Sequence, residues 1–182
     1  MRLLEIEKTI EIPEGIDVSV DGRAVTISGE KGTLTKDFSH APLSIRKDER
    51  LLRLQAKWPR KKEAAIIGTV SSHIGNMIKG VTSGFTYKLK IVFSHFPISV
   101  KVEGNNVLVE NFTGERSPRL AKIVGDVKVS VKSEDVIVQG INLEEVSQTA
   151  ANIEQATKVK IKDPRVFLDG LYVYERAEGM EA

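Results

Sequence analysis

The sequence predicts an α+β protein built from two tandem copies of one small domain. Three observations predict this class: an internal repeat about 82 residues apart, strand-like stretches of alternating side chains, and one amphipathic helical stripe in each half. The 182 residues can hold two small domains. We therefore expect domains at 1–95 and 96–182, each with a small antiparallel-rich sheet covered on one face by one helix.

The repeat is clearest in the first hairpin of each half. Residues 16–22 (IDVSVDG) are echoed by residues 98–104 (ISVKVEG), and the following short strand at 25–27 is echoed at 107–109. An alternating strand, an acidic residue with glycine and a second strand are typical of a β-hairpin. The run at 29–32 (GEKG) is interpreted as a further hairpin turn rather than a phosphate loop.

More strands are expected along each half. Tyr87–Phe93 and Tyr172–Tyr174 follow the two predicted helices, and we expect each of them to complete the sheet of its own half. The boundary is expected near Pro97, where proline interrupts a strand-like run. The remaining predicted strands are Leu51–Leu54, Val127–Val131 and Val136–Val138.

Each half also contains one predicted helix. The first runs from Pro59 to about Lys79, with Pro59 at the first helical position and Gly80 at the C-terminal cap. The second begins after Asn142 as N-cap, with Glu145 reaching back to the cap. Apolar residues at helical spacing form one stripe on each helix. The stripes comprise Ile66, Ile67, Val70, Ile74, Met77, Ile78 and Val81, and then Leu143, Val146, Ala150 and Ile153.

Composition excludes several classes of protein. There is no cysteine, so the chain has neither disulfides nor a thiolate zinc site. The start resembles no signal peptide, and no apolar run reaches the roughly 18 residues that span a bilayer, so we expect a cytoplasmic protein without membrane partners. The net charge of +2 alone is weak evidence for nucleic-acid binding.

No motif in the sequence predicts catalysis. The three histidines are far apart and match no metal-ligand spacing, and the nucleophile-elbow, Walker and dinucleotide motifs are missing. His73, beside the first apolar stripe, is interpreted as a partly buried structural histidine. We therefore expect no catalytic residue, metal, cofactor or small-molecule substrate. An enzyme with a site assembled between the halves stays open as a rival hypothesis.

The strongest candidate site is a basic run near the C-terminus. Its lysines alternate with Val159 and Ile161, which predicts a strand with the lysines on one face, broken at 163–164 by Asp-Pro. Such a face suits a phosphate backbone, and the alternative is a solvated strand face that resists aggregation. The cations of this run are Lys158, Lys160, Lys162 and Arg165.

Two neighbouring residues, Gly170 and Tyr172, extend this candidate RNA site, because each could bring the chain close to nucleotides. Gly170 allows close backbone approach, and Tyr172 belongs either to the core or to a base stack. Phe167 is assigned to the core. Within the basic run, Arg165 is suited to bidentate phosphate contacts, whereas the lysines act as point charges.

A second basic cluster surrounds the sole tryptophan, Trp58, at the start of the first helix. Cations are unfavourable at a helix N-terminus, so a nearby phosphate is one explanation and a solvated charge run is the other. A third basic stretch, 116–122, is expected to form a loop or short strand with unspecific RNA contact. The cations of the second cluster are Lys57, Arg60, Lys61 and Lys62.

Residues 155–176 resemble a signature of a known family. The resemblance is to the large-subunit ribosomal protein L-six family in its archaeal and eukaryotic form, which is called L-nine in eukaryotes. A second stretch, 139–153, also resembles this family, including its bacterial branch. The bacterial branch carries a glycine- and lysine-rich run where this chain has 163–170, so bacterial contacts transfer only loosely. The matching signature positions are Gln155, Val159, Lys162, Arg165, Phe167, Asp169, Gly170, Leu171, Tyr172, Val173 and Arg176.

The resemblance implies a structural constituent of the large ribosomal subunit, acting in translation as part of a ribonucleoprotein. It implies binding to large-subunit rRNA near the stalk base and the translation-factor site, with neighbouring ribosomal proteins as further partners. Phosphate neutralisation and shape recognition would provide the binding. The alternative is a protein–protein scaffold without direct RNA binding.

Overall fold

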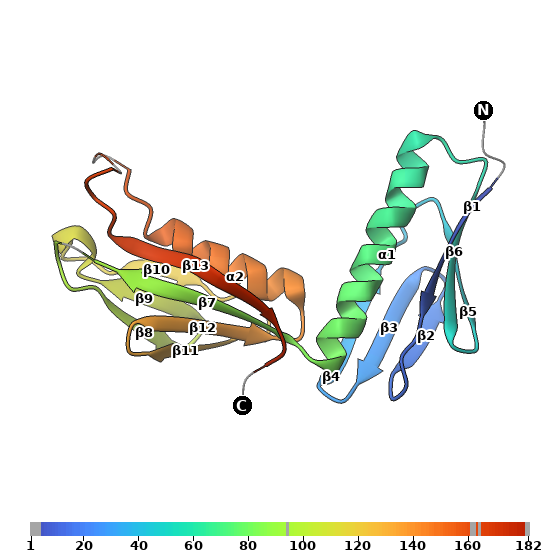
Figure 1. Ribbon diagram of the computed structural model, residues 1–182, viewed down its shortest axis with the longest axis horizontal. Helices are drawn as coiled ribbons and strands as arrows, with labels where there is room; N and C mark the ends of the chain where they lie inside the picture. Colours follow the sequence, from blue (N-terminus) through green and yellow to red (C-terminus); the bar gives the residue numbers. More distant parts are fainter. Residues whose placement is uncertain (1–4, 94, 161–162, 164, 181–182) are drawn as a thin grey trace. The chain divides into compact units, whose positions relative to one another are not determined.

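The computed structural model describes residues 5–93, 95–160, 163 and 165–180 (Figure 1). The chain forms two compact units, Met1–Ser83 and Gly84–Ala182, here called the N-unit and the C-unit. Each unit combines antiparallel sheets with one long helix, so the predicted α+β class is confirmed. Within the described residues each unit contains two small sheets, where the sequence predicted one.

The N-unit pairs its strands in the orders β1-β6-β5 and β2-β3-β4. The helix α1 packs against strands of both sheets (Figure 1). Gly29 and Gly32 close the β3–β4 hairpin, as their spacing predicted. Its elements are β1 (Glu5–Glu11), β2 (Asp17–Asp21), β3 (Ala24–Gly29), β4 (Gly32–Asp37), β5 (Ser44–Asp48), β6 (Leu51–Lys57) and α1 (Lys61–Thr82).

The C-unit repeats this arrangement and adds one strand. Its sheets have the orders β10-β9-β8 and β11-β12-β7-β13, and α2 packs against β7, β10, β12 and β13 (Figure 1). Its elements are β7 (Phe85–Val92), β8 (Ser99–Glu103), β9 (Asn106–Glu110), the 3₁₀ turn η1 (Phe112–Gly114), β10 (Arg119–Lys122), β11 (Lys128–Lys132), β12 (Asp135–Gly140), α2 (Leu143–Ala156) and β13 (Gly170–Glu178).

The expectation that Tyr87–Phe93 completes the first sheet is wrong. The strand there, β7, lies between β12 and β13 in the C-unit, with Leu89 opposite both Val136 and Val173. In the N-unit the corresponding place beside β6 is taken by β1. Each copy therefore begins with its own strand before the hairpin. For this reason the units divide after Ser83, whereas the sequence placed the boundary between residues 95 and 96.

The predicted helices form, with corrected ends. Arg60 is the N-cap of α1, and the helix continues through Gly80 to Thr82. Gly80, which the sequence placed at the C-terminal cap, is therefore inside the helix, and Gly84, at φ +76°, is the left-handed residue that follows the helix end. Asn142 caps α2 as predicted, because its side chain accepts a hydrogen bond from the N–H of Glu144 at 3.1 Å.

Each unit has its own hydrophobic core. The stripe of α1 lies in one core and the stripe of α2 in the other, as the helical spacing predicted. Ile74 and Ile153 are almost completely buried, and so are the strand residues Leu54 and Leu89 of the same two cores. Separate cores give each unit the means to hold its surface loops rigidly.

Candidate nucleic-acid interface

The basic run lies in the connection between α2 and β13, and both ends of this connection are anchored. Thr157 is buried, and its hydroxyl accepts a hydrogen bond from the N–H of Leu171 at 3.0 Å. The carboxylate of Glu154 accepts from the N–H of Val173 at 3.5 Å. The first residue after α2 is thereby joined to the start of β13, which holds the connection as a closed loop.

A contact that the sequence did not predict fixes the end of this loop. Asp169 is only 1% exposed, and its carboxylate accepts hydrogen bonds from the backbone N–H of His95 at 3.1 Å and from Nδ1 of His95 at 2.8 Å. The ring of Phe167 stacks on the His95 ring, with 4.4 Å between centroids. Phe167 is half-buried, so its predicted core position is met only in part.

Lys158 and Lys160 are exposed on either side of the partly buried Val159. The predicted alternation is therefore present, but residues 158–160 belong to no strand. The N–H of Lys158 donates to Gln155 O at 3.2 Å, and Lys158 O accepts a hydrogen bond from the Arg119 side chain. The backbone groups of Lys158 are therefore not paired with a neighbouring strand. Lys162 and the Ile161 that was expected beside it lie outside the described residues.

Arg165 is exposed, with 88% of its side chain accessible, and it is already paired. Its Nε and Nη2 donate to the two carboxylate oxygens of Asp163 at 3.1 and 2.9 Å. Hydrogen bonds from the side chain and the backbone N–H of Arg165 lower the pKa of Asp163, and the same pairing raises the pKa of Arg165. The guanidinium fork predicted for phosphate thus holds a carboxylate in the unbound chain.

Gly170 and Tyr172 are brought together at the start of β13. Gly170 pairs with Val92 and is buried, and a Cβ on it would lie 3.2 Å from the Tyr172 ring. Tyr172 remains 43% exposed, so of its two expected roles the surface one is available. The absence of a side chain at Gly170 thus lets its backbone lie close to the Tyr172 ring.

The second basic cluster forms one end of the N-unit. Trp58 is 67% exposed and has a left-handed backbone, with φ +53°. Lys57, Arg60, Lys61 and Lys62 are all exposed around it. The backbone N–H of Arg60 donates to the Glu63 carboxylate, which supplies an acidic partner in the first turn of α1. This cluster belongs to a different unit from the Lys158–Arg165 cluster.

The third basic stretch has a structural role at Arg119. This side chain donates to Glu115 at 2.9 and 2.6 Å and to the backbone oxygen of Ala156 at 2.9 Å. Its guanidinium also lies 4.2 Å from the centroid of the Phe112 ring. Arg119 therefore caps the end of α2 and joins it to η1, and it is not one of the residues that we assign to RNA.

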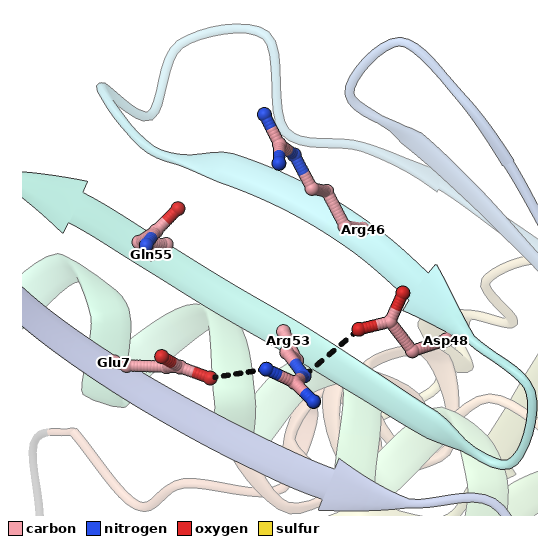
Figure 2. A pocket seen from close by; sticks show the side chains of 5 residues that line it. All are labelled: Glu7, Arg46, Asp48, Arg53 and Gln55. Atoms are coloured by element: carbon pink, nitrogen blue, oxygen red, sulfur yellow. Dashed lines mark ion pairs between the residues drawn. The ribbon is translucent and has the colours of Figure 1, made fainter.

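The exposed face of the β1-β6-β5 sheet carries a small polar depression of about 130 Å³ (Figure 2). Arg53 lies between Glu7 and Asp48 and pairs with them at 3.6 and 2.9 Å (Figure 2). Arg46 and Gln55 complete the lining. These carboxylates are ion-paired on an open surface, so the depression has the character of a solvated sheet face.

The described residues give no support for metal binding or for a membrane span. No group of three or more histidine, aspartate or glutamate side chains within those ranges is placed to hold a metal ion. His73 instead lies 3.3 Å from the ammonium of Lys36 and is half-buried, as expected for a structural histidine. Across the same ranges, no helix has the length and hydropathy needed to span a bilayer.

The two units define a duplicated α+β protein with exposed basic clusters, and comparison with known proteins identifies its family. Residues 12–84 and 96–170 match the model of the ribosomal protein L6 family. Both matched segments begin after the first strand of their unit, β1 or β7. The matched residues make up most of the chain, which therefore belongs to the ribosomal protein L6 family.

Three relatives illustrate the similarity. Large ribosomal subunit protein uL6 of Aeropyrum pernix is 51% identical over 174 residues, which cover 95% of this chain and 96% of the relative. The uL6 proteins of Desulfurococcus amylolyticus and Methanosphaera stadtmanae are 49% and 51% identical, and each comparison covers 98% of this chain and 99% or 97% of the relative. The archaeal form of the family, expected from residues 155–176, is confirmed.

Family membership establishes the general role. The chain is a ribosomal protein with a structural role and not an enzyme, as the missing catalytic motifs predicted. The two matched segments correspond to the internal duplication that the sequence predicted. The rival hypothesis of a small enzyme is therefore wrong.

Proposed function

We propose that this chain is a structural constituent of the large subunit of the cytoplasmic ribosome and binds large-subunit rRNA directly. It would bind near the stalk base, beside the translation-factor site and neighbouring ribosomal proteins, which is the position implied by the family resemblance. The observation that carries direct binding is the anchored loop of the C-unit. Hydrogen bonds fix both of its ends, and its cations Lys158, Lys160 and Arg165 are exposed to solvent.

The proposed mechanism is phosphate neutralisation without chemistry. Lys158 and Lys160 act as point charges that release counterions from the RNA backbone. Arg165 must exchange its bidentate contact with Asp163 for a phosphate, which can also accept two parallel N–H donors from a guanidinium through two of its oxygens. Lys162 remains part of the proposal through its place in the family signature, although it lies outside the described residues.

The basic end of the N-unit is proposed as a second RNA surface. Trp58 exposes a large aromatic ring, and Lys57, Arg60, Lys61 and Lys62 surround it with charge. Exposed aromatic rings among cations suit unpaired bases and their phosphates. A left-handed backbone at a bulky residue costs free energy, which supports a role for Trp58 beyond stability.

A salt series tests both surfaces with the full chain. The probes are transcribed fragments that tile large-subunit rRNA, and the variants are Lys160→Glu/Arg165→Glu and Lys61→Glu/Lys62→Glu. Each variant should weaken binding and make the slope of log K against log salt less steep by about 0.7–0.9 per lost phosphate contact. The matched control is Lys128→Glu/Lys132→Glu, which makes the same charge change on the exposed side of β11.

The outcomes separate the proposals. Equal losses in the control and in the Lys160→Glu/Arg165→Glu variant would show only an effect of net charge. Binding that is unchanged in that variant but lost with Lys61→Glu/Lys62→Glu would move the main surface to the N-unit. Absence of binding by folded wild type would favour the alternative, a protein–protein scaffold whose affinity for its partner responds little to salt.

A further inference from the structure

A groove opens beside the basic loop of the C-unit. Its volume is about 450 Å³, which falls in the range of roughly 300–1,000 Å³ for sites that hold small ligands. The end of α2, the loop and the start of β13 each contribute to it. Its lining residues are Glu154, Gln155, Thr157, Lys158, Val159, Phe167 and Tyr172.

The apolar walls of the groove are held in place. The ring of Phe167 is stacked on His95, and Val159 packs against the core of the C-unit. The Tyr172 ring lies over Gly170, and that position accepts no side chain without moving the ring, since a Cβ would approach it to 3.2 Å. Two aromatic rings in a fixed frame suit a flat, apolar ligand face.

The polar groups of the groove differ in their remaining capacity for hydrogen bonds to a ligand. The Thr157 hydroxyl is occupied, because it accepts from Leu171 and donates to Glu154 O at 3.1 Å. The carboxylate of Glu154 and the carboxamide of Gln155 lie on the side formed by α2, and Lys158 marks the rim. The Oε1 atom of Glu154 already accepts from the N–H of Val173 at 3.5 Å, and because a carboxylate accepts hydrogen bonds only, its other oxygen favours a ligand edge that donates. The Gln155 carboxamide can donate or accept.

We propose that this groove binds one unstacked nucleobase that carries an exocyclic amino group, from the RNA whose phosphates lie on Lys158 and Lys160. The inference rests on the proposed RNA-binding function. The cations of Lys158 and Lys160 complement the phosphates on either side of the base, and Tyr172 supplies a ring for stacking. Glu154 accepts from the amino group, as carboxylates do from cytosine.

Single-stranded RNA oligomers of one length separate base contacts from phosphate contacts. The probes are a ten-residue adenylate, the matching uridylate and an abasic oligomer with the same number of phosphates. Full-length wild type should bind the adenylate about tenfold or more tighter than the abasic oligomer. The uridylate should bind more weakly than the adenylate, because its base has no exocyclic amino group.

Substitution of the groove ring identifies the site. Tyr172→Leu keeps apolar volume but removes the stacking face, and it should lower adenylate affinity about tenfold without changing the salt slope. The matched control is Tyr174→Leu on the same strand, where the ring is exposed but does not line the groove. Far-UV circular dichroism verifies folding, and 2-aminopurine in the adenylate reports stacking by its fluorescence.

Different results would contradict the nucleobase site and the proposed phosphate-binding function. Equal losses from Tyr172→Leu and Tyr174→Leu, or equal wild-type affinity for adenylate and abasic oligomers, would overturn the base site. In that case salt-dependent binding lost with Lys160→Glu/Arg165→Glu would leave the phosphate surface intact. A preference for the uridylate would overturn the assignment of Glu154. If none of the oligomers binds, the base site is wrong, and the rRNA fragments decide the proposed function separately.

Discussion

At the scale of single residues, the pairing of Asp163 with Arg165 is the feature most open to test. The pKa of Asp163 is lowered, so the carboxylate stays charged well below neutral pH. Because the pKa of this carboxyl is lower in the folded chain than the value of about 3.9 in the unfolded chain, the pairing stabilises the fold at pH values above about 3.9. This stabilisation is lost as the pH falls through the folded-state pKa. At physiological pH the carboxylate therefore competes with RNA for the guanidinium.

Removal of this competitor should strengthen RNA binding. Asp163→Asn removes one negative charge and frees Nε and Nη2 of Arg165 for phosphate, so we expect affinity to rise several-fold at low salt and less at high salt. Fluorescence anisotropy across a salt series measures it. Asp126→Asn is the matched control, because this exposed carboxylate lies in the same unit but far along the chain. A rise of equal size in the control would attribute the effect to net charge.

At Trp58, one substitution should affect RNA binding and folding stability differently. Its φ of +53° is costly for a residue with a side chain, and glycine adopts it without strain. Because the ring is largely exposed, Trp58→Gly should leave the free energy of unfolding unchanged or raise it by up to about 1 kcal/mol. Urea denaturation measures this quantity, and the rRNA salt series should show weaker binding. A clear loss of stability would mean that the ring packs in a structural role.

At the scale of elements, Arg119 joins three parts of the C-unit. Its guanidinium bonds to Glu115 and to Ala156 O, and it covers the ring of Phe112, with only 24% of the side chain exposed. Arg119→Ala removes the hydrogen bonds to Ala156 O and Glu115 and the contact with the Phe112 ring, so we expect a loss of about 2 kcal/mol. Chemical denaturation checks it. The exposed Arg116→Ala should stay within about 0.5 kcal/mol, and similar losses in both would contradict this role.

The elements also show which features the sequence could predict. Local patterns were sufficient for the two helices, for the cap at Asn142 and for the hairpin turn at Gly29–Gly32, because each depends on neighbours within a few residues. The partners of β7 could not be predicted in this way. Its strand pattern is local, but its pairing with β12 and β13 joins residues about 50 to 90 positions apart.

In the candidate site, too, the local features could be predicted from the sequence and the long-range contacts could not. The exposure of Lys158 and Lys160 followed from their alternation with Val159, even though no strand forms there. The hydrogen bonds between His95 and Asp169 span 74 residues and left no signal in either stretch. The groove at Tyr172 was likewise hidden, since it needs α2, the loop and β13 to come together.

At the scale of the whole molecule, the position of β7 determines where the chain can be divided. A cut after Ser83 leaves each unit with its own first strand, whereas a cut after His95 removes β7 from the C-unit. The piece 96–182 would lack the strand between β12 and β13, and β13 would have no neighbour in the sheet. It would also lack the buried side chains of Phe85, Leu89 and Ile91.

We therefore expect fragment 84–182 to fold and fragment 96–182 to remain unfolded. Loss of each large buried side chain costs about 2–5 kcal/mol, so three such losses total about 6–15 kcal/mol, which is comparable with the roughly 5–15 kcal/mol that stabilises a typical domain. Thermal unfolding followed by circular dichroism should show a cooperative transition for 84–182 only. In the other half, 1–83 and 1–95 should unfold at similar temperatures, because β7 has no strand partner in the N-unit. A cooperative transition in 96–182 would show that β7 is dispensable and that the unit boundary lies after His95.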